Sequence, residues 1–337
     1  MAQVIRWGIL GTGNIARQFA EGLATARRGV MAAVGSRTAE AAEAFARTYH
    51  IPKAHGSYEG LVTDPGVDAV YVSLPNSMHH EWTIRSFAAG KHVLCEKPLA
   101  ANVAEAQEMV DAADRHGRVL VEAFMYRSHP VTHAVRRAVT GGEIGQLKLI
   151  RTSFCYRTTR VRENIRFNAA LAGGALMDVG CYCIDFSRLF AGADPVAVHA
   201  TGHVHETGVD DLAAGVFGFP GGLVASFTCG MTVQADNTAY LCGTEGFIEI
   251  PVPWKPPREK AQYTIVRATP PRMDGPVKDM VPRQTKYLDA PAHLYAMEAD
   301  DFAATVLDGA KQTISWAESI GNMRLLDDLR RIVGVKF

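Results

Sequence analysis

Residues 4–16 read Val-Ile-Arg-Trp-Gly-Ile-Leu-Gly-Thr-Gly-Asn-Ile-Ala, and this stretch decides the fold of the N-terminal part of the chain. The apolar run 4–10 predicts a strand, and residues 15–26 carry apolar side chains at helical spacing. A glycine-rich turn that follows a strand and opens a helix is typical of the dinucleotide-binding unit G-x-G-x-x-G/A, here with Ala16 in the last place. We therefore predict that the chain starts with a Rossmann-type unit.

The turn itself has the features that a cofactor phosphate needs. Gly11 permits a tight bend, Gly13 lets the backbone come close to a pyrophosphate, and the following helix offers free N–H groups at the positive end of its dipole. The alternative is a glycine turn without a ligand. We expect the cofactor contacts of this turn to come from Gly11, Thr12, Gly13, Asn14 and Ile15.

The end of the second expected strand indicates which nicotinamide cofactor is bound. An acidic side chain at this place grips the ribose 2′-hydroxyl of NAD, but the sequence here is Gly35-Ser36-Arg37-Thr38, with no acid. Arg37 can stack on adenine and pair with a 2′-phosphate, and the hydroxyls of Ser36 and Thr38 can donate to that phosphate. The pattern predicts NADP(H), and the alternative is an arginine on a solvated turn.

Strands and helices alternate as far as residue 123, which predicts an α/β domain with a doubly wound parallel sheet. We expect the strands at residues 4–10, 29–35, 69–74, 92–95 and 119–123. We expect the helices at residues 15–26, 39–48, 81–89 and 103–116.

Beyond residue 124 the pattern changes to long β-rich stretches, and the hairpin-like turn Phe219-Pro220-Gly221-Gly222 predicts an open, mainly antiparallel sheet in an α+β domain. The β-rich stretches are 146–157, 196–206, 212–219 and 222–233, with a helix at 175–190, a proline-rich excursion of strand fragments and loop at 251–282, and amphipathic helices at 292–307 and 315–333. We assign residues 1–123 to a Rossmann NADP-binding domain, 124–310 to a substrate-binding domain, and 311–337 to a C-terminal helix packed on the body.

Composition excludes several classes of function. The 337 residues suffice for two domains, and lysine plus arginine equals aspartate plus glutamate at 35 each, which leaves no strong basic field for nucleic acid or an anionic membrane. No window approaches the roughly 20 apolar residues of a membrane span, and we see no signal peptide. The six cysteines form no zinc-type pairs, and His203 with His205 lacks a third ligand. We therefore expect no metal, and a reducing, cytoplasmic location.

Three residues are candidates for catalysis. Lys97 follows a parallel strand at its carboxyl edge, where open α/β sheets bind ligands, although a surface lysine is the alternative. Asp178 and Tyr182 are four residues apart on the expected helix and so lie on one face. A phenol, with an ordinary pKa near 10, can accept a proton when an ammonium stabilises its phenolate. We predict that Lys97 and Tyr182 form such a pair, and that Asp178 binds a sugar hydroxyl or orients the others.

Together the motifs resemble the glucose-fructose oxidoreductase, inositol dehydrogenase and rhizopine catabolism protein superfamily over nearly the whole chain. The motifs that carry this resemblance are the turn 11–16, Leu74-Pro75-Asn76-Ser77-Met78-His79, Glu96-Lys97-Pro98, Glu122-Ala123-Phe124-Met125-Tyr126-Arg127, and residues 173–182. Many relatives carry D-x-x-x-H in the last motif, whereas this chain has D-x-x-x-Y. In this it is similar to the subgroup of dimeric trans-dihydrodiol dehydrogenases, NADP-dependent D-xylose and other aldose 1-dehydrogenases, and glucose-fructose oxidoreductase.

The resemblance implies roles for residues at matching positions. Tyr182 would be the acid/base, Lys97 would bind the reacting oxygen, and Asp178 would position the substrate. The residues expected around the nicotinamide end are Leu74, Pro75, Asn76, His79, Glu96 and Lys97, with a helix-cap histidine as the alternative for His79. Candidate neighbours of the substrate or of the 2′-phosphate are Arg127, Arg157, Arg160, Arg162 and Arg166. The alternative is that these arginines are surface charges. The resemblance also implies a homodimer or higher homo-oligomer that forms through the outer face of the second sheet.

These observations predict an NADP(H)-dependent oxidoreductase that transfers hydride between nicotinamide and a sugar or related cyclic alcohol, as in an aldose 1-dehydrogenase. A reductase of a sugar ketone or dicarbonyl, or a trans-dihydrodiol dehydrogenase, would use the same chemistry. Two alternatives belong to other classes. One is a glycosidase that transiently oxidises its substrate with tightly held NAD, and the other is a non-enzymatic NADP sensor.

Overall fold

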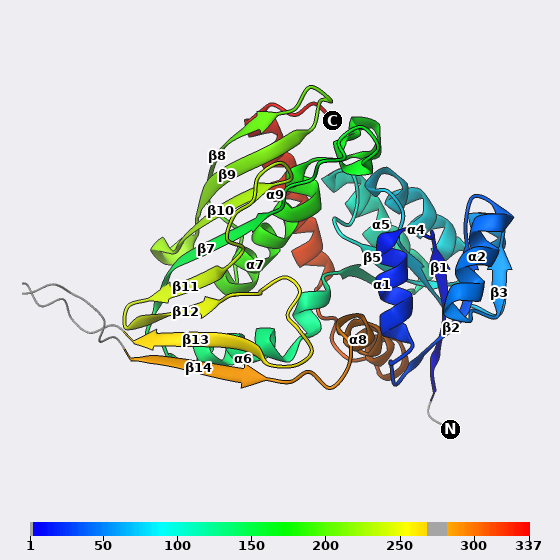
Figure 1. Ribbon diagram of the computed structural model, residues 1–337, viewed down its shortest axis with the longest axis horizontal. Helices are drawn as coiled ribbons and strands as arrows, with labels where there is room; N and C mark the ends of the chain where they lie inside the picture. Colours follow the sequence, from blue (N-terminus) through cyan, green and yellow to red (C-terminus); the bar gives the residue numbers. More distant parts are fainter. Residues whose placement is uncertain (1–2, 268–281) are drawn as a thin grey trace, which may run out of the picture.

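In the computed structural model, which describes residues 3–267 and 282–337, the N-terminal part of the chain forms a six-stranded parallel sheet (Figure 1). The strand order is β3-β2-β1-β4-β5-β6, with β1 (Ile5–Leu10), β2 (Gly29–Gly35), β3 (Lys53–His55), β4 (Ala69–Val72), β5 (His92–Glu96) and β6 (Leu120–Ala123). The connecting helices are α1 (Asn14–Leu23), α2 (Ala39–Tyr49), α3 (Tyr58–Val62), α4 (His79–Ala88) and α5 (Val103–His116). The predicted parallel sheet is confirmed, and every expected strand and helix of this part is present.

Two elements of this sheet were not predicted from the sequence. The strand β3 has three residues and the helix α3 has five. Neither is long enough to show a hydrophobic period, which needs several turns or alternations. The strand β4 also ends at Val72, two residues before the predicted end, so Leu74 and Pro75 already belong to the loop at the carboxyl edge of the sheet.

The second part of the chain forms an eight-stranded sheet that makes up one side of the molecule (Figure 1). Its order is β14-β13-β12-β11-β7-β10-β9-β8, with β7 (Leu147–Cys155), β8 (Ala197–Val204), β9 (Asp210–Gly218), β10 (Val224–Gly230), β11 (Ala239–Gly243), β12 (Gly246–Ile250), β13 (Ala261–Arg267) and β14 (Arg283–Leu288). The predicted hairpin between β9 and β10 is confirmed, and neighbouring strands are antiparallel except for the central pair β7 and β10. Residues 268–281 of the predicted proline-rich excursion lie outside the described residues.

Helices α7 (Cys181–Ala191) and α9 (Trp316–Val333) lie between this sheet and the first domain (Figure 1). The predicted helix 175–190 starts with a π-helical turn, Leu176–Gly180, before α7 begins. The predicted C-terminal helices correspond to α8 (Leu294–Asp308), which packs on α1, and α9, which packs on α5. The helix α6 (Pro130–Thr140) was missed.

One segment passes the length and hydropathy test for a membrane-spanning helix, contrary to the prediction that no window comes close. It is Ala169–Ala191, with a mean hydropathy of 1.3. Its apolar window is 78% buried inside the protein. The apolar character of this segment is therefore accounted for by its burial beneath the second sheet, where residues 181–188 of α7 are all buried.

A buried charge network fixes the helices of the second part. Arg127 forms two hydrogen bonds to the carboxylate of Asp185 on α7, of 2.9 and 2.6 Å, and a third of 2.8 Å to Glu318 on α9. The Arg127 side chain is 3% exposed and Asp185 is fully buried. Arg127 is therefore a structural residue, and the prediction that it could contact a substrate or a 2′-phosphate is wrong.

Gly11 and Gly13 differ in how well each position would accept a side chain, and a pair of variants tests this difference. Gly11 has a φ of +100°, and a Cβ there would lie 3.0 Å from the backbone oxygen of Ser73, whereas a Cβ at Gly13 would meet no atom within 4 Å. We expect Gly11→Ala to lower the free energy of unfolding by about 1–2 kcal/mol. Gly13→Ala should stay within about 0.5 kcal/mol of the unaltered protein. Chemical denaturation of both variants measures this, and equal losses would contradict the conformation described for the turn.

Candidate active site

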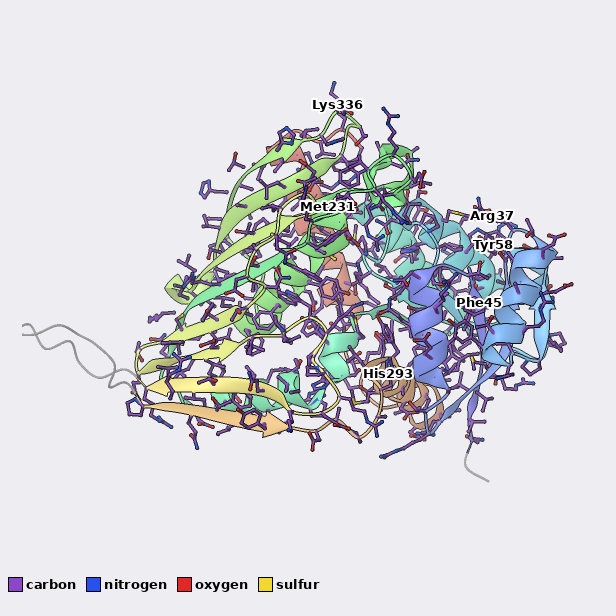
Figure 2. The ribbon with its side chains drawn as sticks, in the orientation of Figure 1. Arg37, Phe45, Tyr58, Met231, His293 and Lys336 are labelled. Atoms are coloured by element: carbon purple, nitrogen blue, oxygen red, sulfur yellow. The ribbon has the colours of Figure 1, made fainter. Side chains whose placement is uncertain are left out.

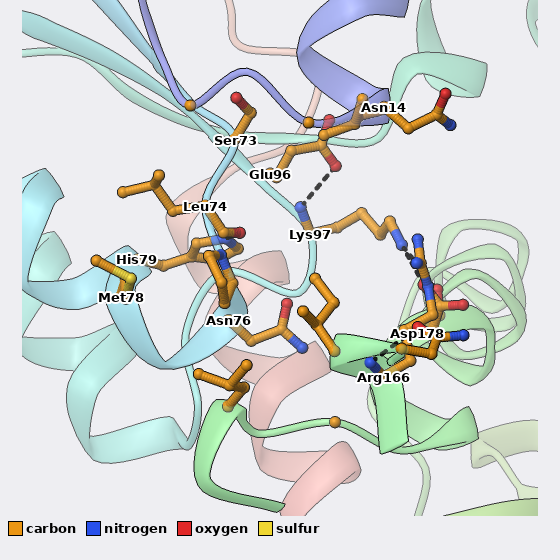
Figure 3. A pocket seen from close by; sticks show the side chains of 18 of the residues that line it. Asn14, Ser73, Leu74, Asn76, Met78, His79, Glu96, Lys97, Arg166 and Asp178 are labelled. Atoms are coloured by element: carbon orange, nitrogen blue, oxygen red, sulfur yellow. Dashed lines mark hydrogen bonds and ion pairs between the residues drawn. The ribbon is translucent and has the colours of Figure 1, made fainter. Parts of the chain in front are cut away.

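A cavity of about 900 Å³ lies between the two domains and is lined from both sides (Figure 3). The carboxyl edge of the parallel sheet contributes the first wall, as open α/β sheets do. The second wall comes from β7, the loop that follows it, the π turn and α7. All of the predicted cofactor residues except Thr38 line this cavity, together with Lys97, Asp178 and Tyr182. A cavity of this size is at the upper end of the range for small-ligand sites, roughly 300–1,000 Å³.

The glycine turn fits a phosphate group. Gly13 occupies the N-cap position of α1, where no side chain satisfies the first backbone N–H groups of the helix. The space beyond its Cα is open toward the cavity, since a Cβ would meet no atom within 4 Å. Exposed N–H groups at a positive helix end, with no side chain in front of them, make an anion-binding site.

The end of β2 presents Ser36 and Arg37 to the same cavity, next to Tyr58 (Figure 2). The Ser36 hydroxyl lies 3.5 Å from that of Thr12 in the glycine turn. Arg37 forms no ion pair within the described part of the chain. Thr38 is different from the prediction, because its hydroxyl accepts a hydrogen bond of 3.3 Å from the Ala41 N–H, caps α2 and does not line the cavity.

Asp178 is the centre of the polar part of the site (Figure 3). Its carboxylate accepts a hydrogen bond of 2.7 Å from the Tyr156 hydroxyl and pairs with Arg166 at 2.8 Å and Lys97 at 3.5 Å. The Lys97 ammonium also donates to the Asp178 backbone oxygen at 2.7 Å. Burial opposes ionisation of this carboxyl, but Lys97 and Arg166 outweigh it and lower the pKa of Asp178 to about 2. Asp178 is therefore a carboxylate at all physiological pH values, and it raises the pKa of Lys97 in turn.

Tyr182 does not form the predicted ammonium–phenolate pair. The Lys97 ammonium lies over the face of the Tyr182 ring, 4.9 Å from its centre, and the phenol oxygen lies 3.4 Å from the sulfur of Met125. Burial, reinforced by the Glu96 carboxyl, raises the pKa of Tyr182 well above its ordinary value. The predicted lowering of this pKa by Lys97 is wrong because the ammonium is held by Asp178. Tyr182 is therefore a neutral phenol at neutral pH.

The remaining residues predicted for the nicotinamide end shape the cavity wall. Both ring nitrogens of His79 contact backbone oxygens, of Pro98 at 3.0 Å and Leu74 at 2.9 Å, so the buried ring ties together the loops after β4 and β5. The side-chain amide of Asn76 donates a hydrogen bond of 2.8 Å to the backbone oxygen of Ala172, and this bond links the loops to the second domain. Glu96 accepts a hydrogen bond from the buried Tyr71 hydroxyl. Burial raises the pKa of Glu96.

Of the candidate arginines, only Arg166 lines the cavity. Arg157, Arg160 and Arg162 are exposed and lie outside it. His203 pairs with Asp211 at 2.6 Å, and no group of three or more potential metal ligands occurs in residues 3–267 and 282–337.

Sequence reasoning missed several residues of the site. Tyr156 and Lys255 both line the cavity. Lys255 follows a tryptophan and precedes a proline in Pro253-Trp254-Lys255-Pro256. The two prolines of this stretch indicate a loop with a restricted backbone, which was a signal in the sequence. Tyr156 had no signal, because its hydroxyl reaches Asp178 only through the packing of β7 against the π turn.

Comparison with known proteins shows the family to which the chain belongs. Residues 5–124 match the model of the oxidoreductase family with an NAD-binding Rossmann fold, and residues 132–249 match the GFO/IDH/MocA C-terminal domain. The trans-1,2-dihydrobenzene-1,2-diol dehydrogenases of Mus musculus and Macaca fascicularis are 35% and 36% identical, each over 99% of this chain and 98% of the relative.

Solved structures of similar proteins extend over almost the whole chain. A 3-ketoreductase from Actinomadura kijaniata, in complex with NADP and TDP-benzene, is 29% identical with a TM-score of 0.85, and 98% of each chain is covered. An aldose-aldose oxidoreductase from Caulobacter crescentus is 26% identical with a TM-score of 0.84, covering 98% of this chain and 97% of that one. The chain therefore belongs to the glucose-fructose oxidoreductase, inositol dehydrogenase and rhizopine catabolism protein family, and it is an NAD(P)-binding oxidoreductase.

Proposed function

We propose that the chain is an NADP(H)-dependent oxidoreductase that interconverts a ring alcohol and its carbonyl in a sugar or related cyclic compound. One observation carries this proposal: Lys97, Asp178 and Tyr182 line the same cavity as the glycine turn and Arg37. The proposed reaction centre and the proposed cofactor site thus belong to one continuous cavity. No acidic residue at the end of β2 lines the cavity, which supports NADP over NAD.

The nature of the cavity wall supports a cyclic substrate. Phe154 and Tyr182 line the cavity and pack edge-on against each other. The buried Trp254 does not line the cavity but stacks on Phe154, with ring centres 5.6 Å apart. Such an aromatic surface favours a flat or ring-shaped ligand, while Lys97 and Arg166 supply hydrogen-bond donors for hydroxyls. A trans-dihydrodiol is a second candidate substrate, because a dehydrogenase named for it matches over 99% of this chain.

In the proposed reaction, bound NADP(H) supplies the hydride donor or acceptor. The Lys97 ammonium donates a hydrogen bond to the reacting oxygen, and Asp178 holds this ammonium in place. Tyr182 exchanges the proton with the same oxygen. Both donors keep their protons at neutral pH, since the pKa values of Lys97 and Tyr182 are raised. The neutral phenol is thus ready to protonate a carbonyl oxygen, while alcohol oxidation needs the phenolate and speeds up as the pH rises.

We further propose that the chain forms a homodimer through the outer face of the eight-stranded sheet. Apolar side chains on this sheet are solvent-exposed in the single chain, including Val216 at 43% on β9 and Val224 at 42% on the neighbouring strand β10. Exposed apolar positions gathered on one sheet face are typical of an interface. Sedimentation velocity of the full chain should give twice the monomer mass, and a monomer at micromolar concentration would contradict the proposal.

The test of the function is a screen of NADP⁺ reduction across aldoses, inositols, anhydro-sugars and trans-dihydrodiols. The purified protein is first checked for bound nucleotide. We expect turnover with at least one ring alcohol and a higher kcat/KM with NADP⁺ than with NAD⁺, since Arg37 faces the cavity at the end of β2.

Gly13→Ala is the matched control for this screen, because its methyl group would point into the space proposed for the pyrophosphate. It should fold as the unaltered protein does and fail to bind NADP⁺. A preference for NAD⁺ would contradict the cofactor assignment. Release of sugar without net change in the cofactor would indicate the redox glycosidase, and binding without any turnover would indicate the sensor.

Two variants test the proposed acid/base roles. Tyr182→Phe removes only the hydroxyl, so we expect kcat to fall by about 10²-fold or more while KM changes little. Lys97→Met should lower kcat by a similar factor with NADP⁺ binding retained, because it removes the donor to the reacting oxygen. Steady-state kinetics and a separate NADP⁺ titration measure both. A Lys97 variant with full rate and intact NADP⁺ binding would overturn this scheme.

A further inference from the structure

Lys255 reaches from the second domain across the cavity to the first. It lies in the loop between β12 and β13, and its ammonium donates a hydrogen bond of 3.0 Å to the side-chain oxygen of Gln18 on α1. Gln18 is one helical turn beyond Asn14, on the helix that the glycine turn opens. Both Gln18 and Lys255 line the cavity, so this contact spans the groove beside the proposed phosphate site.

The loop presents Lys255 in a fixed position. Trp254 is 3% exposed, and its ring stacks on Phe154. Its indole N–H donates a hydrogen bond of 2.9 Å to the backbone oxygen of Ser153. Pro256 follows directly and is buried, and a proline restricts the backbone of the residue before it to extended conformations. The lysine is therefore held by its two neighbours, and only its side chain is free to adjust.

The charge of Lys255 is not compensated by the protein. In the described residues no carboxylate lies within ion-pair distance of its ammonium, and Gln18 is neutral. Desolvation and then the Lys97 ammonium lower the pKa of Lys255, and the other charges that act on it are Glu96, Asp178 and Arg166. All four of these charged residues line the same cavity as Lys255. A cation held here without a counterion is suited to bind an anion.

We propose that Lys255 binds the cofactor phosphate on the nicotinamide side and so clasps the cofactor between the two domains. This inference rests on the proposed function, and it adds a cofactor residue that comes from the second domain. The glycine turn holds the pyrophosphate from one side through backbone N–H groups, and Lys255 holds it from the other side through a charged hydrogen bond. Release of the cofactor then requires this clasp to open.

The experiment measures the Kd of NADP⁺ by isothermal titration calorimetry for the unaltered protein and for Lys255→Met. We expect the variant to bind NADP⁺ about tenfold more weakly, the size of one partly exposed charged hydrogen bond. Its affinity should also depend less on salt, because one screened charge contact is lost. Lys255→Arg should retain an affinity within about threefold of the unaltered protein. Lys260→Met is the matched control, since Lys260 is an exposed lysine of the same loop that does not line the cavity.

Adenosine 2′,5′-bisphosphate serves as a second ligand, because it carries the 2′-phosphate but lacks the nicotinamide half. Lys255→Met should bind it as the unaltered protein does. An unchanged Kd for NADP⁺, or an equal loss for both ligands, would overturn the inference and leave the proposed function standing. Failure of the unaltered protein to bind NADP⁺ would instead overturn the proposed function, and this inference with it.

Discussion

The contact between Lys97 and Asp178 is the interaction on which the proposed reaction centre depends. Lys97 stands at the end of β5 in the first domain and Asp178 in the π turn of the second, so the contact joins the two domains across the cavity. A buried carboxylate is costly unless its charge is compensated and its oxygens are hydrogen-bonded. Lys97, Arg166 and Tyr156 supply this compensation. The requirements of one buried charge thus fix the positions of three further side chains.

The surrounding fold holds both partners of this contact in place. On one side, His79 links the loops that follow β4 and β5, and Lys97 belongs to the second of these loops. On the other side, the buried Asp210 carboxylate accepts a hydrogen bond of 2.7 Å from the Leu176 N–H, at the start of the π turn that carries Asp178. The buried network of Arg127 and Asp185 anchors the helix that follows this turn. Rigid elements on both sides therefore hold Lys97 and Asp178 in fixed positions. Because these side chains are already ordered, little conformational entropy would be lost when a substrate binds.

Much of this could be predicted from sequence, and what could not has a physical reason. The glycine turn, the alternation of strands and helices, and the Lys97, Asp178 and Tyr182 motifs are local patterns, and each appears in the structure where it was expected. The short β3 and α3 were missed because they show no period. The partners of the Asp178 carboxylate come from β7 and the loop after it, which reach Asp178 only through long-range packing. The sequence therefore could not assign Tyr156 or Arg166 as partners of Asp178. For the same reason the sequence suggested that Lys97 would serve Tyr182, whereas the folded chain gives its ammonium to Asp178.

We infer that Lys97 and Asp178 act as one unit in the proposed reaction. A double-mutant cycle tests it most directly, with kcat/KM measured for Lys97→Met, Asp178→Asn and the combined variant on one substrate with NADP⁺. If the carboxylate acts by holding the ammonium, the combined variant should be no more than about threefold slower than the slower single variant, because the second change removes nothing further. Losses that multiply would show that the two residues contribute independently, and would contradict the proposed coupling between them.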